Sequence, residues 1–442
     1  MNQLISVIGL EIHVELKTKS KMFCGCPADH FGEKPNTQTC PVCLALPGAL
    51  PVSNKKAIDW TIMIGLALNC RVNLESTFDR KHYFYPDLPK GYQISQYDDP
   101  FCFSGHLLLA SGKKIRINRV HLEEDTAKMQ HKTINGKKLT LVDFNRSGVP
   151  LVEIVTEPDV TSGAEAKEFL KKLRDILRHL QVSDCDMEKG SMRLEPNISW
   201  SESVNNLADY KVEIKNLNSF RFTETAIDYE LKRQKEILDR GETPIQETRG
   251  YKPQQKITFS QRIKETAADY RYFPEPDIPP IVLTLDYVEK LRAKLPKLPE
   301  AEINELIKDF HLNIYTAQLL VKDASKLAYF KKYLSEIDPV VLANLIVNKK
   351  IDLAKPPPQK TVTRAVDSKI ISQVIQENAG AVAKYQAGKT TVIGFLVGQV
   401  MRLSNGKVDP VQAKQMLESN LRGPTSQAKL LMGCGGYTLI SR

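Results

Sequence analysis

Three short segments of this chain place acidic and imidazole side chains inside runs that otherwise favour buried β-strands. These segments are residues 9–15, 121–125 and 149–155. Alternate side chains of a strand share one face, so Glu11, His13 and Glu15 project together, away from the aliphatic residues between them. Glu153 stands alone in an apolar run, where an unpaired carboxylate is costly to bury. The sequence therefore predicts a fold that brings these groups to a common charged partner.

The residue types in these segments indicate the nature of that partner. Carboxylates with one imidazole suit Mg²⁺ or Mn²⁺ better than Zn²⁺. A hard divalent cation is what a phosphoryl-transfer site uses to neutralise nucleotide phosphates.

The length and composition indicate a soluble protein of several domains. A chain of 442 residues is too long for one ordinary core, and we expect two to four domains. The hydrophobic fraction of 42% and the charged fraction of 26% are typical of globular proteins. No apolar run approaches the roughly 18–20 residues that span a bilayer. The first residues lack the features of a secretory signal, so we expect a cytoplasmic protein without a membrane partner.

The formal net charge of +10 is unevenly distributed along the chain. Residues 1–290 contain 40 basic and 40 acidic side chains, whereas residues 291–442 contain 22 and 12. A neutral body with a basic tail predicts that the tail approaches a polyanion such as RNA. A basic helical domain without a nucleic-acid partner is the alternative.

Four of the eight cysteines form a pattern typical of a metal site. Thirteen residues separate a C-x-C pair from a C-x-x-C pair, which resembles a four-thiolate zinc knuckle. Empty cysteines and redox chemistry are the alternatives, and disulfides are the weaker explanation in a reducing cytosol. The predicted Zn²⁺ ligands are Cys24, Cys26, Cys40 and Cys43.

The remaining patterns predict an α+β fold. Residues 1–160 read as β-strands and loops, and a helix begins after the capping pair Ser162 and Glu165. A second helix is expected over residues 223–240, ending before Gly241, with a strand at 210–214 between the two helices. We therefore expect a β-rich cradle body with helices over residues 1–284, with the cysteine cluster at 24–43.

Helical periodicity dominates the rest of the chain. We expect an all-α domain over residues 285–355, with helices at 285–295, 299–310, 313–323 and 338–349. Three prolines at 356–358 predict a stiff connector. A small helical tail domain, 361–442, follows and is the predicted RNA-binding part. Its end after Arg422 loses amphipathic periodicity and is expected to be frayed.

Two loops combine cations with groups that bind nucleotides. Residues 80–93 mix aromatic and basic side chains, which suit stacking on a base and gripping phosphate. In residues 143–150, Arg146 is the preferred phosphate contact, because a guanidinium binds phosphate oxygens in a bidentate way. An aromatic loop packed on the sheet and a structural turn are the respective alternatives. The candidates from these loops are Arg80, Lys81, His82, Tyr83, Lys90, Arg146 and Ser147.

Two later segments add weaker candidates. Arg193 and Lys215 can meet phosphates, Asn216 can orient a substrate, and Glu195 can add a metal ligand. No Walker, protein-kinase or dinucleotide-binding motif is present. No amidase or glutaminase constellation is evident either, so ammonia chemistry would require nitrogen from a partner protein.

Taken together, these stretches resemble the B subunit of the tRNA-dependent aspartyl/glutamyl-tRNA amidotransferases, the GatB family. The resemblance runs in order through the body, and the tail is similar at residues 394–401. The matching stretches of the body are residues 9–16, 40–51, 80–96, 121–125, 143–159, 183–193, 213–219, 246–250 and 269–277.

The resemblance implies a glutamine-hydrolysing glutaminyl/asparaginyl-tRNA synthase, a ligase that uses ATP and Mg²⁺. It implies phosphorylation of the side-chain carboxylate of Glu-tRNA(Gln) or Asp-tRNA(Asn), followed by amidation with ammonia from the amidotransferase's A subunit. The A and C subunits would complete a heterotrimer. Carried over by position, the catalytic metal ligands are Glu11, His13, Glu124 and Glu153, with Glu195 where the family usually has aspartate.

Two other functions stay open at this point. The chain could be a non-catalytic, zinc-bearing subunit that presents aminoacyl-tRNA to a partner enzyme. It could also be a metal-dependent ligase that acts on a free amino acid and turns over without tRNA.

Overall fold

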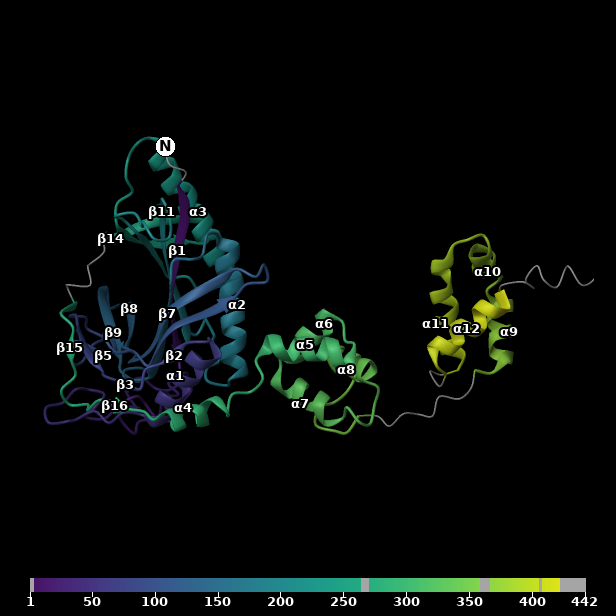
Figure 1. Cartoon of the computed structure of the whole chain (residues 1–442), viewed down its shortest axis with the longest axis horizontal. Helices are drawn as coiled ribbons and strands as arrows, with labels where there is room; N and C mark the ends of the chain where they lie inside the picture. The colour runs from purple at the N-terminus through teal and green to yellow at the C-terminus, as the bar shows by residue number, and fades with distance from the viewer. Residues whose placement is uncertain (1–3, 264–269, 358–365, 405–407, 422–442) are drawn as a thin grey trace, which may run out of the picture. The chain divides into compact units, whose positions relative to one another are not determined.

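The structure, a computed structural model, describes residues 4–263, 270–357, 366–404 and 408–421 (Figure 1). The chain divides into two compact units, Met1–Ala324 and Ser325–Arg442. Strands dominate the first part of the chain and helices the remainder, so the predicted α+β class is confirmed. None of the helices in the described ranges is long and apolar enough to cross a membrane.

A nine-stranded mixed sheet forms the centre of the first unit. Neighbouring strands are antiparallel except for the parallel pair β12–β13. The strands, in spatial order, are β14 (Ile257–Ile263), β13 (Glu247–Lys252), β12 (Val212–Lys215), β11 (Met192–Ser201), β1 (Ile5–Glu15), β10 (Pro150–Thr156), β7 (Lys114–Glu124), β6 (Cys102–Leu108) and β2 (Arg71–Val72).

One face of this sheet is apolar and is covered by helices α2 (Gly163–His179) and α3 (Phe220–Asp239) (Figure 1). Leu10 and Ile12 of β1 are almost fully buried in the same core as Phe169 and Leu173 of α2. Each such side chain contributes roughly 1.5–3 kcal/mol by leaving water. The apolar set of β1 therefore determines which face of the strand points toward the helices.

The helix ends show how local sequence positions these elements. The Ser162 side chain caps α2 by accepting from the Glu165 backbone N–H, as predicted. Ser219 caps α3, which begins at Phe220, three residues before the predicted start. Gly241, just past the end of α3, has a φ of +78°, which suits the glycine expected there.

Helix α1 (Lys55–Ala67) was not predicted from the sequence. Its buried residues lie all around the helix and leave no single apolar stripe for periodicity to reveal. Asn54 caps it through two backbone N–H groups. Helix α1 packs on β6 and β7, and α4 (Leu285–Arg292) packs on α1, where the Tyr287 hydroxyl hydrogen-bonds with Asp59.

Smaller sheets flank the main one. β15 (Phe273–Pro274), β4 (Asp79–His82) and β5 (Tyr92–Ser95) form a three-stranded sheet, and β3 (Glu75–Ser76) pairs with β16 (Ile281–Val282). β5 contacts β7 on the polar face of the main sheet, where the Ser95 hydroxyl donates to Glu123 at 3.0 Å. β8 (Lys128–Ile134) and β9 (Lys137–Asp143) form a separate hairpin.

The helical segments continue in both units. The first unit includes α5 (Pro299–Phe310) and α6 (Ile314–Val321), and α7 (Ala324–Lys332) begins at the unit boundary. The predicted domain boundaries at 284 and 355 stay predictions. The second unit continues with α8 (Pro339–Val347), α9 (Ser368–Glu377), α10 (Ala379–Gln386), the 3-10 turn η2 (Thr390–Val392), α11 (Ile393–Leu403) and α12 (Pro410–Leu421).

Helices α9, α11 and α12 share a small core that includes Ile371, Leu396 and Leu417. The expected frayed end after Arg422 lies outside the described residues.

Gly65 in α1 is predicted to be intolerant of a side chain. A Cβ at this position would lie 2.2 Å from the Cys102 Sγ, so Gly65→Ala should lower the free energy of unfolding by about 1–3 kcal/mol. Gly398→Ala in α11, where a Cβ meets nothing within 4 Å, is the control and should be neutral or slightly stabilising. Urea unfolding measures both, and an undisturbed Gly65→Ala protein would contradict the packing described.

Candidate active site

The polar face of the main sheet forms the floor of a cavity of about 510 Å³. Side chains of β1, β7, β10, β11 and β12 line it, and loop residues beyond β4, including Tyr83, and after β14 complete the wall. The register explains the floor: His13 lies opposite Glu153 on one side and Arg193 on the other, and Glu153 lies opposite His121. Residues paired directly across antiparallel strands share a face, so a row of charged groups crosses four strands.

Two carboxylates and an imidazole meet in this row. His13 Nε2 lies 3.4 Å from Glu153 Oε2 and 3.7 Å from Glu123 Oε1. One candidate ligand atom from each of the three residues lies within 4.8 Å of the others. His121 Nε2 adds a contact of 3.1 Å to Glu153. This set is compact enough to hold one cation.

The groups of the row stabilise one another in their charged forms, with His13 protonated and Glu153 ionised. Burial by itself lowers the pKa of His13, but the carboxylates of Glu153 and Glu123 outweigh it and raise the pKa to about 9. Burial by itself raises the pKa of Glu153, but the imidazoles of His121 and His13 hold it well below its usual value. The protonated His13 thus supplies the positive charge that the buried carboxylates require.

A second acidic group lies in the same cavity. Glu11, Glu195 and Glu213 also offer oxygens within 4.8 Å of one another. Lys215 Nζ lies 2.7 Å from Glu195 and 3.9 Å from Glu213. Burial alone lowers the pKa of Lys215, but these carboxylates raise it. Asn197 Nδ2 donates to Glu11 at 2.8 Å, so each of the three acids contacts a donor or a cation.

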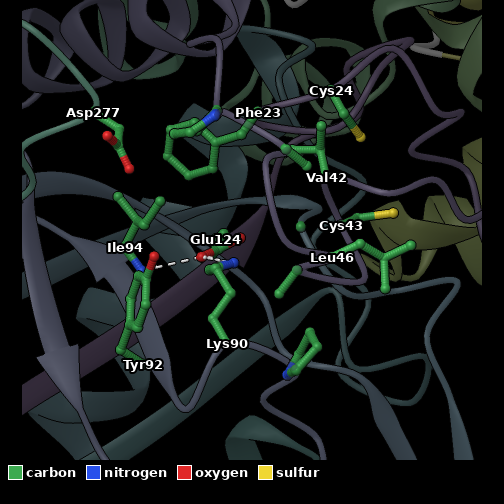
Figure 2. A pocket seen from close by; sticks show the side chains of 15 residues that line it. Phe23, Cys24, Val42, Cys43, Leu46, Lys90, Tyr92, Ile94, Glu124 and Asp277 are labelled. Carbon is green, nitrogen blue, oxygen red and sulfur yellow. Dashed lines mark hydrogen bonds and ion pairs between the residues drawn. The ribbon is translucent and has the colours of Figure 1, made fainter.

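Glu124 lies outside this cavity, contrary to the expectation that it joins His13 and Glu153. Successive residues of β7 point to opposite faces, so Glu123 enters the cluster with His13 and Glu153, and Glu124 points away. Glu124 accepts from the Ile94 backbone N–H at 3.0 Å and pairs with Lys90 at 2.6 Å (Figure 2). Both residues line a separate cavity of about 210 Å³ beside Cys24. The predicted phosphate contact Lys90 is therefore also outside the main cavity.

The other predicted contacts divide into two groups. Lys81, Tyr83, Arg193 and Lys215 line the cavity, as do the predicted acids Glu11, His13, Glu153 and Glu195. Arg80, His82, Arg146, Ser147 and Asn216 do not line it.

The residues outside the cavity are held by structural contacts. Arg80 pairs with Glu275 at 2.7 Å, and the His82 ring stacks on Phe273. Arg146 donates to the Thr126 carbonyl at 2.8 Å. Ser147 Oγ donates to the Cys43 carbonyl at 3.2 Å. Asn216 adopts a left-handed backbone conformation with a φ of +63°, typical of a turn.

Tyrosines and a half-buried lysine form the wall opposite the sheet. Lys81 Nζ lies 4.9 Å from the centre of the Tyr270 ring, and Tyr97 stacks on Tyr272 with ring centres 4.3 Å apart. Burial lowers the pKa of Lys81, but Tyr272, Glu123 and Glu153 outweigh it and raise the pKa. The cation therefore faces the carboxylates across the cavity.

Sequence reasoning missed several residues of this cavity. Strand alternation, applied to residues 121–125, selects His121, Glu123 and Asp125, and this signal was present in the sequence. Asp125 contacts Arg193, and the guanidinium groups of Arg146 and Arg193 hold its pKa below the usual value, although burial alone would raise it. Lys211 and Glu213 alternate with apolar residues in the predicted strand at 210–214, so the same signal was present there as well. Strand alternation gives no signal for the loop residues Tyr97, Gln246, Tyr270 and Tyr272.

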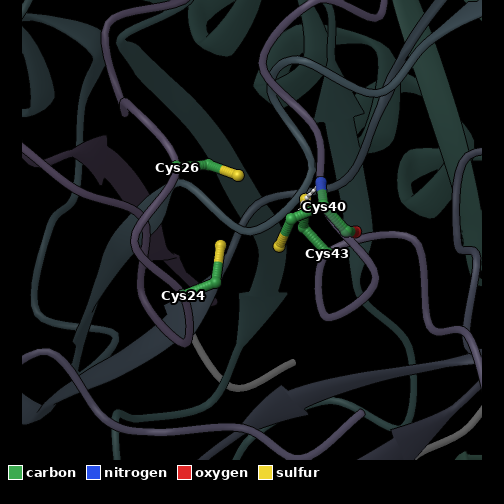
Figure 3. Close-up of side chains that lie close together, drawn as sticks. All are labelled: Cys24, Cys26, Cys40 and Cys43. Carbon is green, nitrogen blue, oxygen red and sulfur yellow. Dashed lines mark hydrogen bonds between the residues drawn. The ribbon is translucent and has the colours of Figure 1, made fainter.

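The four predicted zinc-ligand cysteines lie together (Figure 3). All four thiols are free, and their Sγ atoms lie within 4.8 Å of one another. Lys21, which is only 1% exposed, approaches the Cys43 Sγ at 3.6 Å. The hydrogen bond from Cys24, the Cys40 backbone N–H and the Lys21 ammonium lower the pKa of Cys43 to about 4, although burial raises it.

Comparisons with known proteins agree with this architecture. Residues 6–289 match the family described as the GatB/GatE catalytic domain, and residues 360–421 match the GatB domain. The chain is therefore a protein of the GatB/GatE catalytic class.

Relatives define the family within that class. The chain is 44% identical to the B subunit of aspartyl/glutamyl-tRNA(Asn/Gln) amidotransferase from Thermomicrobium roseum, over 95% of this chain and 99% of that protein. The corresponding proteins of Thermosipho melanesiensis and Thermotoga maritima are 43% and 41% identical, over 93% and 94% of this chain and 98% and 99% of those proteins. The chain belongs to the GatB family.

The stability of the metal-free protein should depend on pH through His13. The folded pKa of about 9 exceeds the ordinary value of 6.5, so the stabilisation is complete below pH 6.5 and lost as pH rises through 9. It amounts to roughly 3 kcal/mol. Urea unfolding of the parent and of His13→Gln in a chelator should show a difference that shrinks over this window. A constant difference would contradict the assigned charge.

Proposed function

We propose that this chain is the catalytic B subunit of a tRNA-dependent amidotransferase. In the proposed reaction it uses ATP to phosphorylate the side-chain carboxylate of Glu-tRNA(Gln), Asp-tRNA(Asn) or both. The acyl phosphate then reacts with ammonia to give Gln-tRNA(Gln) or Asn-tRNA(Asn). Family membership and the row of carboxylates and imidazoles in the main cavity support this proposal. The row is the observation that carries it.

The donor set fits a hard divalent cation such as Mg²⁺. Two carboxylates and one imidazole present their donor atoms within 4.8 Å of one another, and the two acids are buried. The proposed ligands are His13, Glu123 and Glu153, so Glu123 takes the role first expected for Glu124. The cluster of Glu11, Glu195 and Glu213 is the second candidate position. When bound, the metal supplies positive charge to the phosphates of ATP.

The chain's own cations also favour phosphate binding. Lys81, Arg193 and Lys215 line the same cavity as the acids. A carboxylate attacks a phosphoryl group poorly unless cations offset the repulsion between the two anions. We therefore propose that these side chains hold the triphosphate and the substrate carboxylate close together, while the tyrosine wall limits the access of water.

The proposed reaction needs only ATP, the aminoacyl-tRNA carboxylate and ammonia. A carboxylate oxygen of the aminoacyl side chain bonds to the γ-phosphorus, and the bond to the β-phosphate oxygen breaks to release ADP. Ammonia then attacks the acyl carbon, phosphate leaves, and the nitrogen loses a proton to give the amide. Phosphorylation thus converts a poor leaving group into a good one.

A second cavity supports a place for the nucleoside of ATP. It has a volume of about 310 Å³ and shares Glu11, Lys211 and Gln246 with the main cavity. Val7 and Leu10 contribute an apolar part of its lining. A base bound there would direct its phosphates toward the acids and lysines.

The remaining proposals concern the tail, the partners and zinc. Residues 291–442 contain 22 basic and 12 acidic side chains, and this positive balance supports tRNA binding by the tail. Ammonia would come from the A subunit of the amidotransferase, with the C subunit completing a heterotrimer. The four gathered thiols support a structural Zn²⁺ ion.

Separate replacement of two adjacent acids of β7 by glutamine tests the phosphorylation step. Glu123→Gln should lower ADP formation with Glu-tRNA(Gln), measured without glutamine, by at least about a hundredfold, because it removes a carboxylate from the proposed metal site. Glu124→Gln is the matched control and should stay within about threefold of the parent. Affinity for tRNA should survive in both variants.

Other outcomes of the same assay would decide against the proposal. Normal ADP formation by Glu123→Gln would favour the non-catalytic, tRNA-presenting protein. ADP formation with free glutamate in place of tRNA would favour the free-amino-acid ligase.

Zinc content tests the role of the cysteines. The purified chain should hold one zinc ion, and Cys43→Ser should lose it and unfold at a lower temperature, because the folded site supplies the ligands. Cys185→Ala, which removes a buried thiol elsewhere, should retain the metal. Elemental analysis with thermal unfolding measures both, and a zinc-free parent chain would refute the assignment.

A further inference from the structure

The β8–β9 hairpin projects from the body without support along most of its length. Asn135 and Gly136 connect the strands with φ values of +49° and +75°, as in the tight turns that match strand twist. Every residue of the hairpin from 131 to 141 is exposed, and the two strands form their own sheet. A two-stranded hairpin with both faces in water is marginally stable. The contacts at the base of the hairpin are therefore needed to hold it in one orientation.

The base of the hairpin is attached to the cysteine segment. The Asn36 backbone N–H donates to Asp143 at 3.0 Å, and the Asn36 side chain donates to the Val142 carbonyl at 3.2 Å. The Phe144 backbone N–H donates to the Asn36 side chain at 2.7 Å. Asn36 lies between the two cysteine pairs, so the cysteine segment orients the hairpin.

The strand register sorts the hairpin side chains into two different faces. Gln130 pairs with Leu141 and Lys132 with Leu139, which places them on one face. The aliphatic residues of this face are exposed by 41% at Ile134, 43% at Leu139 and 40% at Leu141. The same face carries Lys128, Lys132 and Lys137, with Asp143 beside Lys128 at the base, whereas the opposite face carries Met129, His131, Thr133, Lys138, Thr140 and Val142.

The cysteine segment itself continues into more exposed aliphatic surface. Leu46, Leu50 and Val52, which follow the last cysteine, are exposed by 49%, 62% and 75%. Clustered exposed aliphatic side chains typically mark an interaction site. The features around the cysteines thus point to a surface that meets another molecule.

We propose that the hairpin face of Leu139 and Leu141 docks a partner protein of the amidotransferase. The partner surface would be aliphatic and bordered by carboxylates, because lysines border the leucines on this face. The inference rests on the proposed function, which supplies the multi-subunit assembly. The cysteine cluster then acts in assembly, by holding the arm that reaches the partner.

Two other occupants fit the face less well. Residues 128–143 contain no Phe, Tyr or Trp, whereas single-stranded RNA is usually held by stacking on aromatic rings. A second copy of this chain would bring lysines against lysines, which disfavours self-association.

A pair of charge-matched variants tests the docking face. Leu139→Asp with Leu141→Asp places two carboxylates on the proposed face, and Thr133→Asp with Thr140→Asp places two on the opposite face. Affinity of the full-length chain for the co-purified A and C subunits should fall at least about tenfold in the first variant, since it disrupts an apolar contact. The control should stay within about threefold of the parent. Both variants should unfold at the parent temperature, because the residues are exposed.

The outcomes separate this inference from the function on which it rests. Equal binding of the A and C subunits by both variants would overturn the role of the hairpin alone. The leucine variant could instead keep its affinity for the A and C subunits but lose affinity for tRNA. It could also keep that affinity but no longer form a dimer that the parent chain forms. Either result would also overturn the role of the hairpin in docking a partner subunit. Failure of the parent chain to bind the A and C subunits would overturn the assembly itself, whereas the ADP assay on Glu123→Gln tests catalysis independently.

Discussion

The pairing of β1 between β10 and β11 is the constraint on which the rest of the structure depends. Its aliphatic residues pack against the α2–α3 layer, so the intervening Glu11 and His13 must face the cavity. A slip of one residue would expose the apolar set and bury the charges against the helices. The hydrophobic core therefore holds the charged groups of the main cavity in register. Folding and site geometry have one common cause.

Charge balance explains how so many ionisable groups share this cavity. Each of the two acidic clusters in the cavity contains its own cation. The His13 imidazolium lies beside Glu153 in the first, and the Lys215 ammonium lies beside Glu195 in the second. An unpaired buried charge would cost several kcal/mol. Arrival of a metal and a nucleotide would exchange these internal partners for external ones. The cavity is thus stable without ligand and suited to bind a cation and phosphates together.

Local sequence determined much of the fold and the first part of the site. The cap at Ser162 and the alternation in β1 were readable because each depends on residues a few positions apart. Strand alternation also identifies Glu123 as a cavity residue once β7 is assigned. The prediction named Glu124 instead, because that residue was carried over by position from the family resemblance. Helix α1 could not be predicted, since burial on all sides removes its periodic signal.

Long-range partners account for the rest. Arg80 was a reasonable phosphate ligand until Glu275, 195 residues away, proved to be its partner. The contact between Asn197 and Glu11 spans 186 residues and follows only from strand order. Composition and spacing identify candidate groups, but tertiary pairing decides which of them remain available to a substrate.

Location of a bound Mn²⁺ ion by anomalous X-ray diffraction, with a non-hydrolysable ATP analogue present, tests the central claim most directly. The account predicts a peak coordinated by His13, Glu123 and Glu153, with the analogue's phosphates beside it. A peak at Glu124, or no ion among the three residues at saturating Mn²⁺, would contradict it.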